Sequence, residues 1–444
     1  MTIAFLSLFF GLITGRYPVE VAVNGPVAAV EILIDGRGAG RIQGPPWKTE
    51  VDFGPGLLPH EITARALDAE RRVVSEAREW VNLPHSLVKT DILVEGGGDG
   101  SAPKAARVVW ANLQGQKPRS VRLTFDGLPV PLDGDGRATL PPHDLKSIHV
   151  LTADVEFSPL RSVRRDLAYG GEYGSEISTE LTGVPVRVRN GRLPPPEKLG
   201  GWLTSAGAPL TAVAVEEGPA QLYVVRSPDA RETSWTLGSK GLNAGMVLGK
   251  LGKEDEVRFL FPFPERFESG GAVTDLFEIS PPFETSRYGL PALVRSVDKA
   301  RRPGRLEEPG GRLVPQRRIA DAVAVAAQAA IQENRRRAVL LVLSGHEKDE
   351  SGYDPATVRR YLAALHVPLF VWSLEKPAPG STAAAWGEAV DVSAAKNLSG
   401  AVRAVREELE SQRIIMVDGR HLPQSITLTP SAAGLELVGE GSVP

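Results

Sequence analysis

The segment Ala338–Leu374 reads AVLLVLSGHEKDESGYDPATVRRYLAALHVPLFVWSL, and it predicts a strand, a loop, a helix and a second strand. The first apolar run has no polar alternation, which is typical of a strand buried on both faces. Asp354 is suited to cap a helix whose first position is Pro355. Two strands joined by a helix indicate a parallel sheet, in which ligands bind outside the carboxyl ends of the strands. Function is therefore expected in the loop that begins at Ser344.

Composition limits the protein classes that fit this chain. With 444 residues, two to four domains are expected. The net charge of -3 argues against a nucleic-acid partner, because such proteins carry a basic surface. The absence of cysteine excludes disulfides, thiolate zinc sites and a cysteine nucleophile.

The first residues form an apolar run, IAFLSLFFGLI over Ile3–Ile13. This run has the length of a signal-peptide core and is short for a membrane span, although no Lys or Arg precedes it. We expect residues 1–16 to be a signal peptide or short anchor, and the protein to be secreted, periplasmic or in the cell envelope. A buried first strand is the alternative. No membrane insertion beyond an N-terminal anchor is expected.

Two consecutive β modules are predicted, at 17–84 and 85–195. Alternating apolar residues end in an Asp-Gly turn signal at Ala29–Gly36, and the same pattern recurs at Ser120–Gly127. Downstream, His60–Ala64 aligns with His149–Ala153. A repeat of this length favours two all-β sandwiches of immunoglobulin-like type.

The pattern changes after the prolines at 194–196. Strands and helices then alternate, which predicts a doubly wound, Rossmann-like α/β domain over 205–420, followed by a C-terminal strand or tail at 421–444. The expected strands are 220–225, 257–261, 273–279 and 413–417, and the expected helices are 319–334 and 398–409. The basic triplet Arg335–Arg337 follows the first helix, where the helix dipole favours cations.

Several of these segments together resemble the bacterial von Willebrand factor type A-related proteins. The resemblance rests on Ala338–Leu374, on EEGPA at Glu216–Ala220, on DEVRFL at Asp255–Leu260 and on AVA at Ala322–Ala324. It implies two immunoglobulin-like β modules followed by a von Willebrand factor A domain.

The resemblance also implies where a cation would bind. Type A domains often hold a divalent cation at the strand ends through an Asp-x-Ser-x-Ser motif, a Thr and a further Asp, all oxygen ligands. Here Arg226 stands where the motif's first Asp is expected, and the loop Ser344–Glu350 lacks the usual Asp-Gly. We therefore expect a degenerate metal site with no cofactor. The candidate partner-binding residues in the strand-end loops are Arg226, Ser227, Asp229, Ser344, His346, Glu347 and Asp349.

Other catalytic patterns are incomplete. His346-Glu347 lacks the second His of a zinc-protease motif, and no Gly-x-Ser-x-Gly elbow follows a strand of the α/β part. The glycine-rich segments Gly96–Pro103 and Gly245–Lys250 lack the Lys-Ser/Thr ending of a phosphate loop. No catalytic residue is expected.

The sequence thus predicts a non-enzymatic, exported interaction or adhesion protein that binds a protein partner of unknown identity. The alternative is an adhesion or sensor domain that depends on a divalent cation such as Mg²⁺ or Ca²⁺. Its ligands would come from a non-standard acidic site, built from Glu347, Asp349, Glu350 and Asp354, which otherwise form a solvated loop. An enzyme of unrecognised type ranks third.

Overall fold

The computed structural model describes residues 2–7, 9, 11–24, 27–84, 88–95, 102–112, 117–126, 128–146, 148–158, 161–170, 181–188, 193–228, 230–239, 250–252, 254–269, 272–284, 289–296, 307–308, 311–312, 316–332 and 334–439. The chain divides into two compact units. One comprises 1–84, 182–417 and 421–444, and the other comprises 85–181 and 418–420. Most of the glycine-rich segments 96–103 and 245–250 lie outside the described residues.

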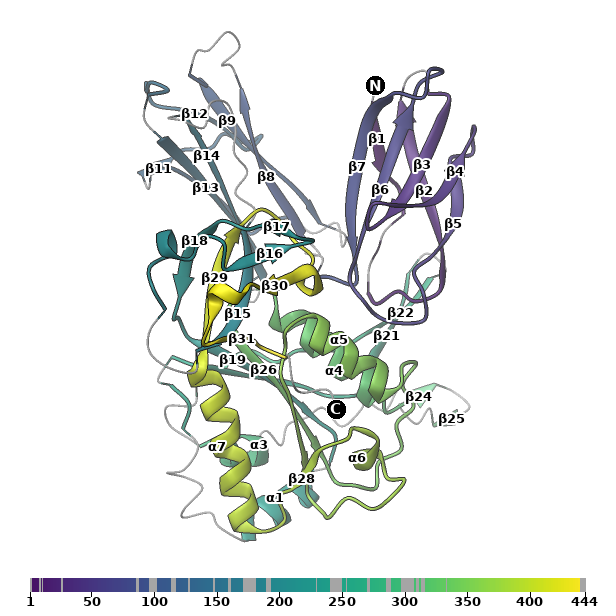
Figure 1. The fold of residues 1–444 in the computed structure, drawn as a ribbon, viewed down its shortest axis with the longest axis vertical. Coiled ribbons are helices and arrows are strands. Elements are labelled where there is room, and N and C mark those ends of the chain that lie inside the picture. The colour runs from purple at the N-terminus through teal and green to yellow at the C-terminus, as the bar shows by residue number, and fades with distance from the viewer. Residues whose placement is uncertain are drawn as a thin grey trace. The chain divides into compact units, whose positions relative to one another are not determined.

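The N-terminal module consists of two antiparallel sheets (Figure 1). One sheet has the order β1 (Thr2–Phe5), β2 (Arg16–Asn24), β5 (Lys48–Asp52), and the other the order β4 (Arg37–Ile42), β3 (Ala29–Ile34), β6 (His60–Leu67), β7 (Val73–Val81). Their inward side chains form one core, in which Val19, Ile32 and Ile62 are fully buried. The sheets therefore form a sandwich, as the alternating pattern predicts.

The apolar run expected to be a leader belongs to this sandwich. Strand β1 pairs antiparallel with β2, with Ile3 opposite Val23. Ile3, Phe9 and Ile13 are buried in the sandwich core. In this structure the segment therefore contributes a first strand and apolar side chains to the space between the two sheets, which is the alternative that the sequence left open.

The second module, in the other unit, also has two antiparallel sheets. Their orders are β12 (Arg137–Thr139), β9 (Ala105–Asn112), β8 (Val88–Glu95) and β11 (Leu128–Val130), β10 (Ser120–Phe125), β13 (Ile148–Ser158), β14 (Arg161–Gly170). Ala106, Leu151 and Val155 are fully buried between them.

The internal repeat extends to side-chain contacts. In the first module, Nδ1 of His60 lies 2.8 Å from Oδ2 of Asp35. In the second, Nδ1 of His149 lies 2.7 Å from Oδ2 of Asp126. Both aspartates have positive φ, 50° and 48°, at the ends of the equivalent strands β3 and β10. The two modules therefore share an Asp–His contact that ties a hairpin turn to the start of a neighbouring strand of the same sheet, β6 in the first module and β13 in the second.

A six-stranded sheet forms the centre of the α/β part (Figure 1). Its order is β23 (Phe283–Glu284), β20 (Glu256–Leu260), β19 (Ala220–Arg226), β26 (Arg336–Leu343), β27 (Leu369–Ser373), β28 (Ala389–Asp391). Five strands are parallel and β23 is antiparallel to β20. The chain winds outward from β19 in one direction and then resumes at β26 in the other, so a topological switch point lies between these two strands.

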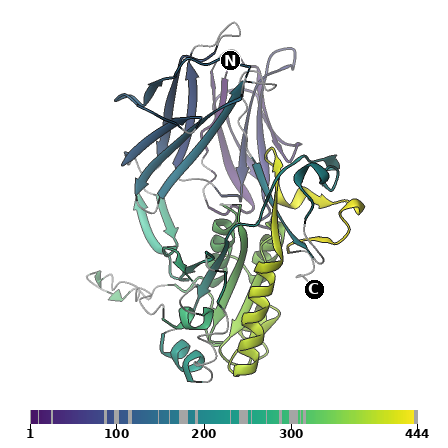
Figure 2. The same ribbon diagram turned by 90° about the vertical axis from the view of Figure 1, so that its left-hand side faces the viewer.

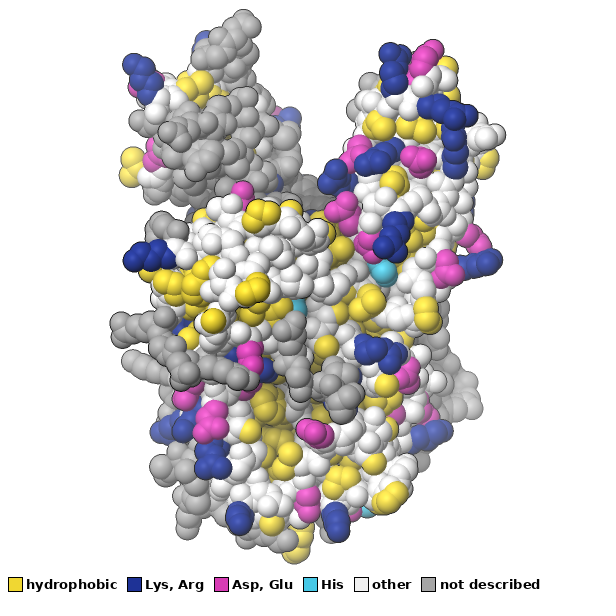
Figure 3. All heavy atoms as spheres, viewed as in Figure 1, with side chains coloured by type: hydrophobic (Ala, Val, Ile, Leu, Met, Phe, Trp, Pro, Cys, Tyr) yellow, Lys and Arg dark blue, Asp and Glu magenta, His cyan; other side chains and the backbone are white. Residues whose placement is uncertain are grey.

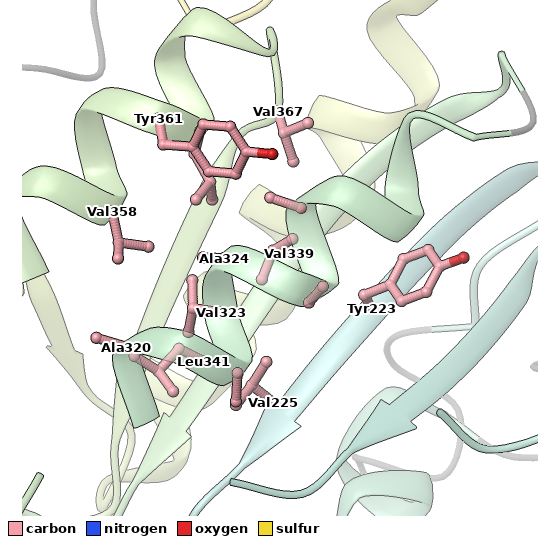
Figure 4. Packing of buried hydrophobic residues seen from close by; sticks show 14 of the residues in the cluster. Tyr223, Val225, Ala320, Val323, Ala324, Val339, Leu341, Val358, Tyr361 and Val367 are labelled. Carbon is pink, nitrogen blue, oxygen red and sulfur yellow. The ribbon is translucent and has the colours of Figure 1, made fainter. Parts of the chain in front are cut away.

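Helices cover both faces of this sheet (Figure 2). One face carries α4 (Ile319–Ala330) and α5 (Pro355–Ala364), and the other carries α1 (Ala230–Ser239), α3 (Leu290–Ser296) and α7 (Ala395–Ser411). Along β26, Val339 and Leu341 pack toward α4 and α5 (Figure 4). Leu340 and Val342 belong to the cluster on the opposite face. Burial on both faces explains why the strand is apolar without alternation. The predicted strand–helix–strand unit is confirmed.

Smaller elements complete the α/β part. The hairpins β21 (Glu265–Ser269)–β22 (Ala272–Leu276) and β24 (Glu307–Glu308)–β25 (Gly311–Arg312) lie between β20 and α4 in the sequence, and α6 (Thr382–Ala385) precedes β28. The sequence predicted that this helix ends at Asn334, but α4 ends four residues earlier, at Ala330. Asn334 has a positive φ of 51°.

A third β region is built from both sides of the α/β insertion, and the sequence did not predict it. Two small sheets form, β18 (Ala212–Glu216), β29 (Gln412–Asp418), β15 (Leu181–Val188), β31 (Leu435–Leu437) and β17 (Ala208–Pro209), β16 (Leu203–Ser205), β30 (Ile426–Leu428). They share a core that includes Val186, Ile415 and Leu437. Short 3₁₀ helices at Pro196–Lys198, Pro423–Ser425 and Pro430–Ala432 connect them.

This region differs from the expected boundaries. Strand β15, predicted within the second module (85–195), pairs with β31 instead. The strand at Arg413–Val417 belongs to β29 and pairs with β18 rather than extending the α/β sheet. Residues 421–438 are not a separate tail, because β30 and β31 pair with strands that precede the α/β part.

His366 connects the turn before β27 to the C-terminal segment. Its Nδ1 lies 3.0 Å from the carbonyl oxygen of Val438, and its Nε2 lies 2.9 Å from that of Pro423. Burial lowers the pKa of His366 below its usual 6.5, and the nearby Arg337 cation lowers it further, against the two carbonyl contacts. The imidazole is therefore neutral at pH 7.

A lowered folded-state pKa makes stability depend on pH. Below pH 6.5 the unfolded chain protonates this histidine more readily than the folded chain, so stability is lost as the pH falls from 6.5 toward the folded pKa. We expect the free energy of unfolding to fall by about 1 kcal/mol between pH 7.5 and 5, and by less in His366→Asn. Urea unfolding across this range measures both slopes, and equal slopes in the two proteins would contradict the assignment.

Candidate functional site

The candidate site lies where β19 and β26 end side by side. Arg226, the last residue of β19, pairs in register with Val342 of β26. The Ser227 amide then donates to the Val342 carbonyl over 3.0 Å. The carboxyl ends of both strands therefore meet at the switch point, where the sequence analysis placed the loop residues.

Arg226 fills the strand end with a buried positive charge. Its side chain is 2% exposed, and Nη2 donates to Oγ1 of Thr233 on α1 over 3.3 Å. Because a guanidinium has no lone pair to offer, the last residue of β19 supplies no ligand for a divalent cation. Asp229, the other charged candidate on this loop, lies outside the described residues.

Two buried hydroxyls lie at neighbouring strand ends. Ser227 follows β19, and Ser373 is the last residue of β27. Among the described residues, neither Oγ has a hydrogen-bond partner. Ser344, which follows β26 between them, is also buried. In the described residues, the ends of β19, β26 and β27 therefore carry a guanidinium and three hydroxyl groups.

Glu347 is buried and folds back onto its own loop. Its Oε1 accepts from the Ser344 amide over 2.5 Å, and its Oε2 accepts from the Gly345 amide over 2.9 Å. Gly345 has a φ of 105°, which favours glycine. The Glu347 carbonyl also accepts from the hydroxyl of Thr382. The carboxylate thus holds the turn that leaves β26.

Asp349 caps helix α4 from a distance in sequence. Its carboxylate accepts from the amides of Ile319 and Ala320 over 2.9 and 3.2 Å, and from the Ser351 amide and hydroxyl over 3.0 and 2.6 Å. Arg318, the residue at the N-cap position, makes no capping side-chain bond. Asp349 therefore stabilises the first turn of α4.

His346 is the most exposed of the described candidates. Its Nε2 lies 2.8 Å from Oε1 of Glu375, which follows β27. Next to it, the side chain of Lys348 is 85% exposed. This part of the loop is therefore accessible to a partner, in contrast to Glu347.

The acidic loop does not converge on one point. Asp354 caps α5 by accepting from the Thr357 amide over 2.9 Å, and its bonds to Thr357 lower its pKa. Glu350 lies 3.4 Å from the Lys348 ammonium. Within the described part of the chain, no group of three or more His, Asp or Glu side chains could hold a metal ion. Each carboxylate of the alternative site interacts with the protein itself.

Sequence reasoning missed Asp321, a buried carboxylate beneath this loop. It accepts from Nε of Arg318 over 2.5 Å and from the amides of Gly352 and Tyr353 over 3.1 and 3.3 Å. An acidic residue in the first turn of an otherwise apolar, alanine-rich helix was the available signal. Asp321 and Asp349 together hold the loop against α4.

Comparison with known proteins yields weak likenesses. No family model and no curated protein matches the sequence. Fibronectin(III)-like modules of Clostridium thermocellum CbhA are 16% identical, with 18% of this chain and 92% of that chain covered and a TM-score of 0.16. The central fibronectin-III array of RIM-binding protein is 10% identical, with coverage of 44% and 80% and a TM-score of 0.22. TM-scores of this size carry no argument about function.

Another similar structure is SGBP-B of the Bacteroides ovatus mixed-linkage glucan utilization locus, in complex with a heptasaccharide. It is 12% identical, with coverage of 48% and 58% and a TM-score of 0.14.

In the described residues, no helix has the length and apolar character needed to cross a membrane.

Proposed function

We propose that this chain is a non-enzymatic, exported interaction protein whose α/β part, of the von Willebrand factor A type, binds a protein partner at the strand-end loops without a cation. The observation that carries the proposal is the buried Arg226 at the tip of β19. Its guanidinium occupies the end of β19 at the switch point and offers no lone pair with which a cation could be ligated. The strand order around β19 and β26 supports binding at these loops, because ligands of open α/β sheets bind at such a switch point.

The acidic groups support cation independence. For Glu347 to bind a metal ion, it would have to release the amides of Ser344 and Gly345, and for Asp349 to do so, α4 would lose its cap. Both changes would leave backbone donors unpaired, which is costly in a buried loop. The exposed side chains of His346, Lys348 and Glu375 are the groups that a partner would contact first.

Calorimetric titration of the full chain with Mg²⁺, Mn²⁺ and Ca²⁺ tests the cation claim. We expect no saturable heat and no change in melting temperature. Saturable binding at micromolar concentration that is lost in Glu347→Gln would overturn the proposal and establish a cation-dependent domain instead.

Site-specific photocrosslinking tests the binding surface. A photoreactive amino acid at Lys348 should capture one discrete protein from cell-envelope extracts of the source organism, equally in the presence of a chelator. The control position is Arg403 on α7, whose side chain is also well exposed, at 69%. Capture of the same species at both positions, or at neither, would refute the strand-end surface.

A further inference from the structure

The first β module and the α/β part belong to one compact unit, and they share a buried core. Leu57, Trp80 and Leu83 of the module lie in the same hydrophobic cluster as residues of α4 and α5. Figure 3 shows hydrophobic side chains on both sides of this junction. Because apolar surface buried between two parts favours their association, the module is packed against these two helices.

Side chains of the α/β part also donate hydrogen bonds to backbone carbonyls of the module. The Tyr361 hydroxyl on α5 donates to the Asn82 carbonyl over 2.7 Å. The Tyr353 hydroxyl donates to the Leu12 carbonyl over 2.8 Å. Tyr361 lies on a helix, whereas Tyr353 belongs to the loop after β26 that carries the candidate site. One of these contacts therefore joins the module directly to the candidate loop.

On the module side, the acceptor lies in a connector between β1 and β2, residues 12–15. Asn82 holds this connector from within, because its side chain accepts from the Ile13 amide over 2.7 Å and donates to the Ile13 carbonyl over 2.9 Å. The Ile13 side chain is buried in the sandwich core. The Leu12 carbonyl that Tyr353 contacts is therefore presented by a segment fixed through both its backbone and its neighbouring side chain.

On the loop side, a series of hydrogen bonds leads from Tyr353 back to the candidate residue Asp349. The amides of Tyr353 and Gly352 donate to the Asp321 carboxylate over 3.3 and 3.1 Å. The Ser351 hydroxyl accepts from the Asp321 amide over 3.2 Å and donates to the Asp349 carboxylate over 2.6 Å. The position of Tyr353 therefore helps to fix the second half of the loop.

We propose that the first β module is a clamp on the candidate loop, in which the connector holds Tyr353 and, through it, the loop as far as Asp349. While the module is docked, the loop is preorganised for a partner, and when the module separates, the loop loosens and binding weakens. This regulatory role rests on the proposed function, because it concerns the same strand-end loop. Burial and the Asp321 carboxylate raise the pKa of Tyr353, so its hydroxyl remains a donor at neutral pH.

Hydrogen exchange of the full chain tests the clamp without the partner. Ile13→Ala weakens the anchoring of the connector inside the sandwich, and we expect the amides of Gly352 and Tyr353 to exchange about five- to tenfold faster. Ile3→Ala is the matched control, since it makes the same truncation in the same core, at 7% exposure against 5% for Ile13. The control should change these rates by less than about twofold. Equal acceleration in both variants would overturn the proposal, because the loop would then respond only to the stability of the sandwich.

A double-mutant cycle tests whether the connector and Tyr353 act through one contact. Tyr353→Phe alone should accelerate exchange at Gly352 about fivefold, because one hydrogen bond to the module is lost. Combined with Ile13→Ala, it should add less than about twofold, since both substitutions release the same contact. Full additivity of the two effects, or unchanged exchange in either single variant, would contradict the clamp.

Photocrosslinking from Lys348 tests the consequence for binding. The yield of the captured protein should fall several-fold in Ile13→Ala and stay at the native level in Ile3→Ala. Equal yields in the two variants would overturn the regulatory role. An absence of capture by the native chain would contradict the proposed function instead, and the exchange rates alone would then decide whether the module clamps the loop.

Discussion

Asp321→Ala is expected to destabilise the α/β part by about 3–5 kcal/mol, the cost typical of removing one partner from a buried ion pair. The Asp321 carboxylate is 2% exposed and accepts from Arg318 and from two amides of the loop after β26. Without it, the Arg318 cation loses its short contact, and the amides of Gly352 and Tyr353 lose their acceptor. The substitution should therefore loosen both the first turn of α4 and the loop that carries the candidate site.

Urea unfolding combined with hydrogen exchange measures this effect where it arises. The amides of Gly352 and Tyr353 should lose protection first, because they bond directly to the missing carboxylate. Glu350→Ala is the matched control, since it removes a carboxylate from the same loop whose side chain is 37% exposed. We expect that control to change stability by less than about 0.5 kcal/mol. Equal losses in the two variants would show that Asp321 does not hold the loop.

Local sequence signals predicted the central part of the α/β sheet well. The apolar runs of β26 and β27 indicate strands that are buried on both faces. The pair Asp354–Pro355 indicates the start of a helix. The capping bond from the Thr357 amide to Asp354 is the contact that the sequence implied. The Asp-Gly repeat likewise reports a turn that needs positive φ at Asp35 and Asp126.

Pairings between distant segments could not be predicted in the same way. Strand β15 pairs with β31, about 250 residues later in the chain, and each has short apolar stretches that fit many partners. Periodicity identifies which face of a strand is buried but not the strand that covers it. The third β region therefore could not be predicted from the sequence on either side of the α/β part alone.

In the candidate site, too, the sequence predicted the location but not the contacts between distant segments. The topology rule correctly located the loops at the switch point, because it depends only on strand order. The roles of individual acids did not follow, since Glu347 and Asp349 are defined by amides that the fold brings to them. A carboxylate in a loop has the same sequence signature whether it caps a remote helix or binds a cation.

Asn82 is expected to be as sensitive as Asp321, because one buried amide satisfies several backbone groups. Its Oδ1 accepts from the Ile13 amide over 2.7 Å, and its Nδ2 donates to the carbonyls of Ile13 and Leu58 over 2.9 and 3.1 Å. Its own carbonyl accepts from the Tyr361 hydroxyl over 2.7 Å. Asn82 also has a φ of 61°, a conformation that Asn tolerates better than Ala.

Asn82→Ala should therefore lower the free energy of unfolding by about 3–5 kcal/mol, since it removes the partner of two buried backbone groups of Ile13 and of the partly buried Leu58 carbonyl, and adds backbone strain. Asn82→Asp keeps the shape and the acceptor but places a carboxylate against two carbonyl oxygens. We expect a similar loss at pH 7 that diminishes toward pH 5 relative to the native chain, because protonation restores a donor.

The pH dependence of Asn82→Asp shows whether its destabilisation comes from the lost hydrogen-bond donor or from a change in side-chain shape. Asn397→Ala is the control, since it removes an amide that donates to the Asp391 carbonyl over 3.0 Å at an exposed position. That variant should lose less than about 1 kcal/mol, because water replaces the exposed bond. Urea unfolding at pH 7 and 5 compares the three variants with the native chain. If Asn82→Asp were as stable as the native chain at pH 7, the buried amide would not be what fixes the Ile13 segment, and its apolar contacts alone would hold it in the sandwich.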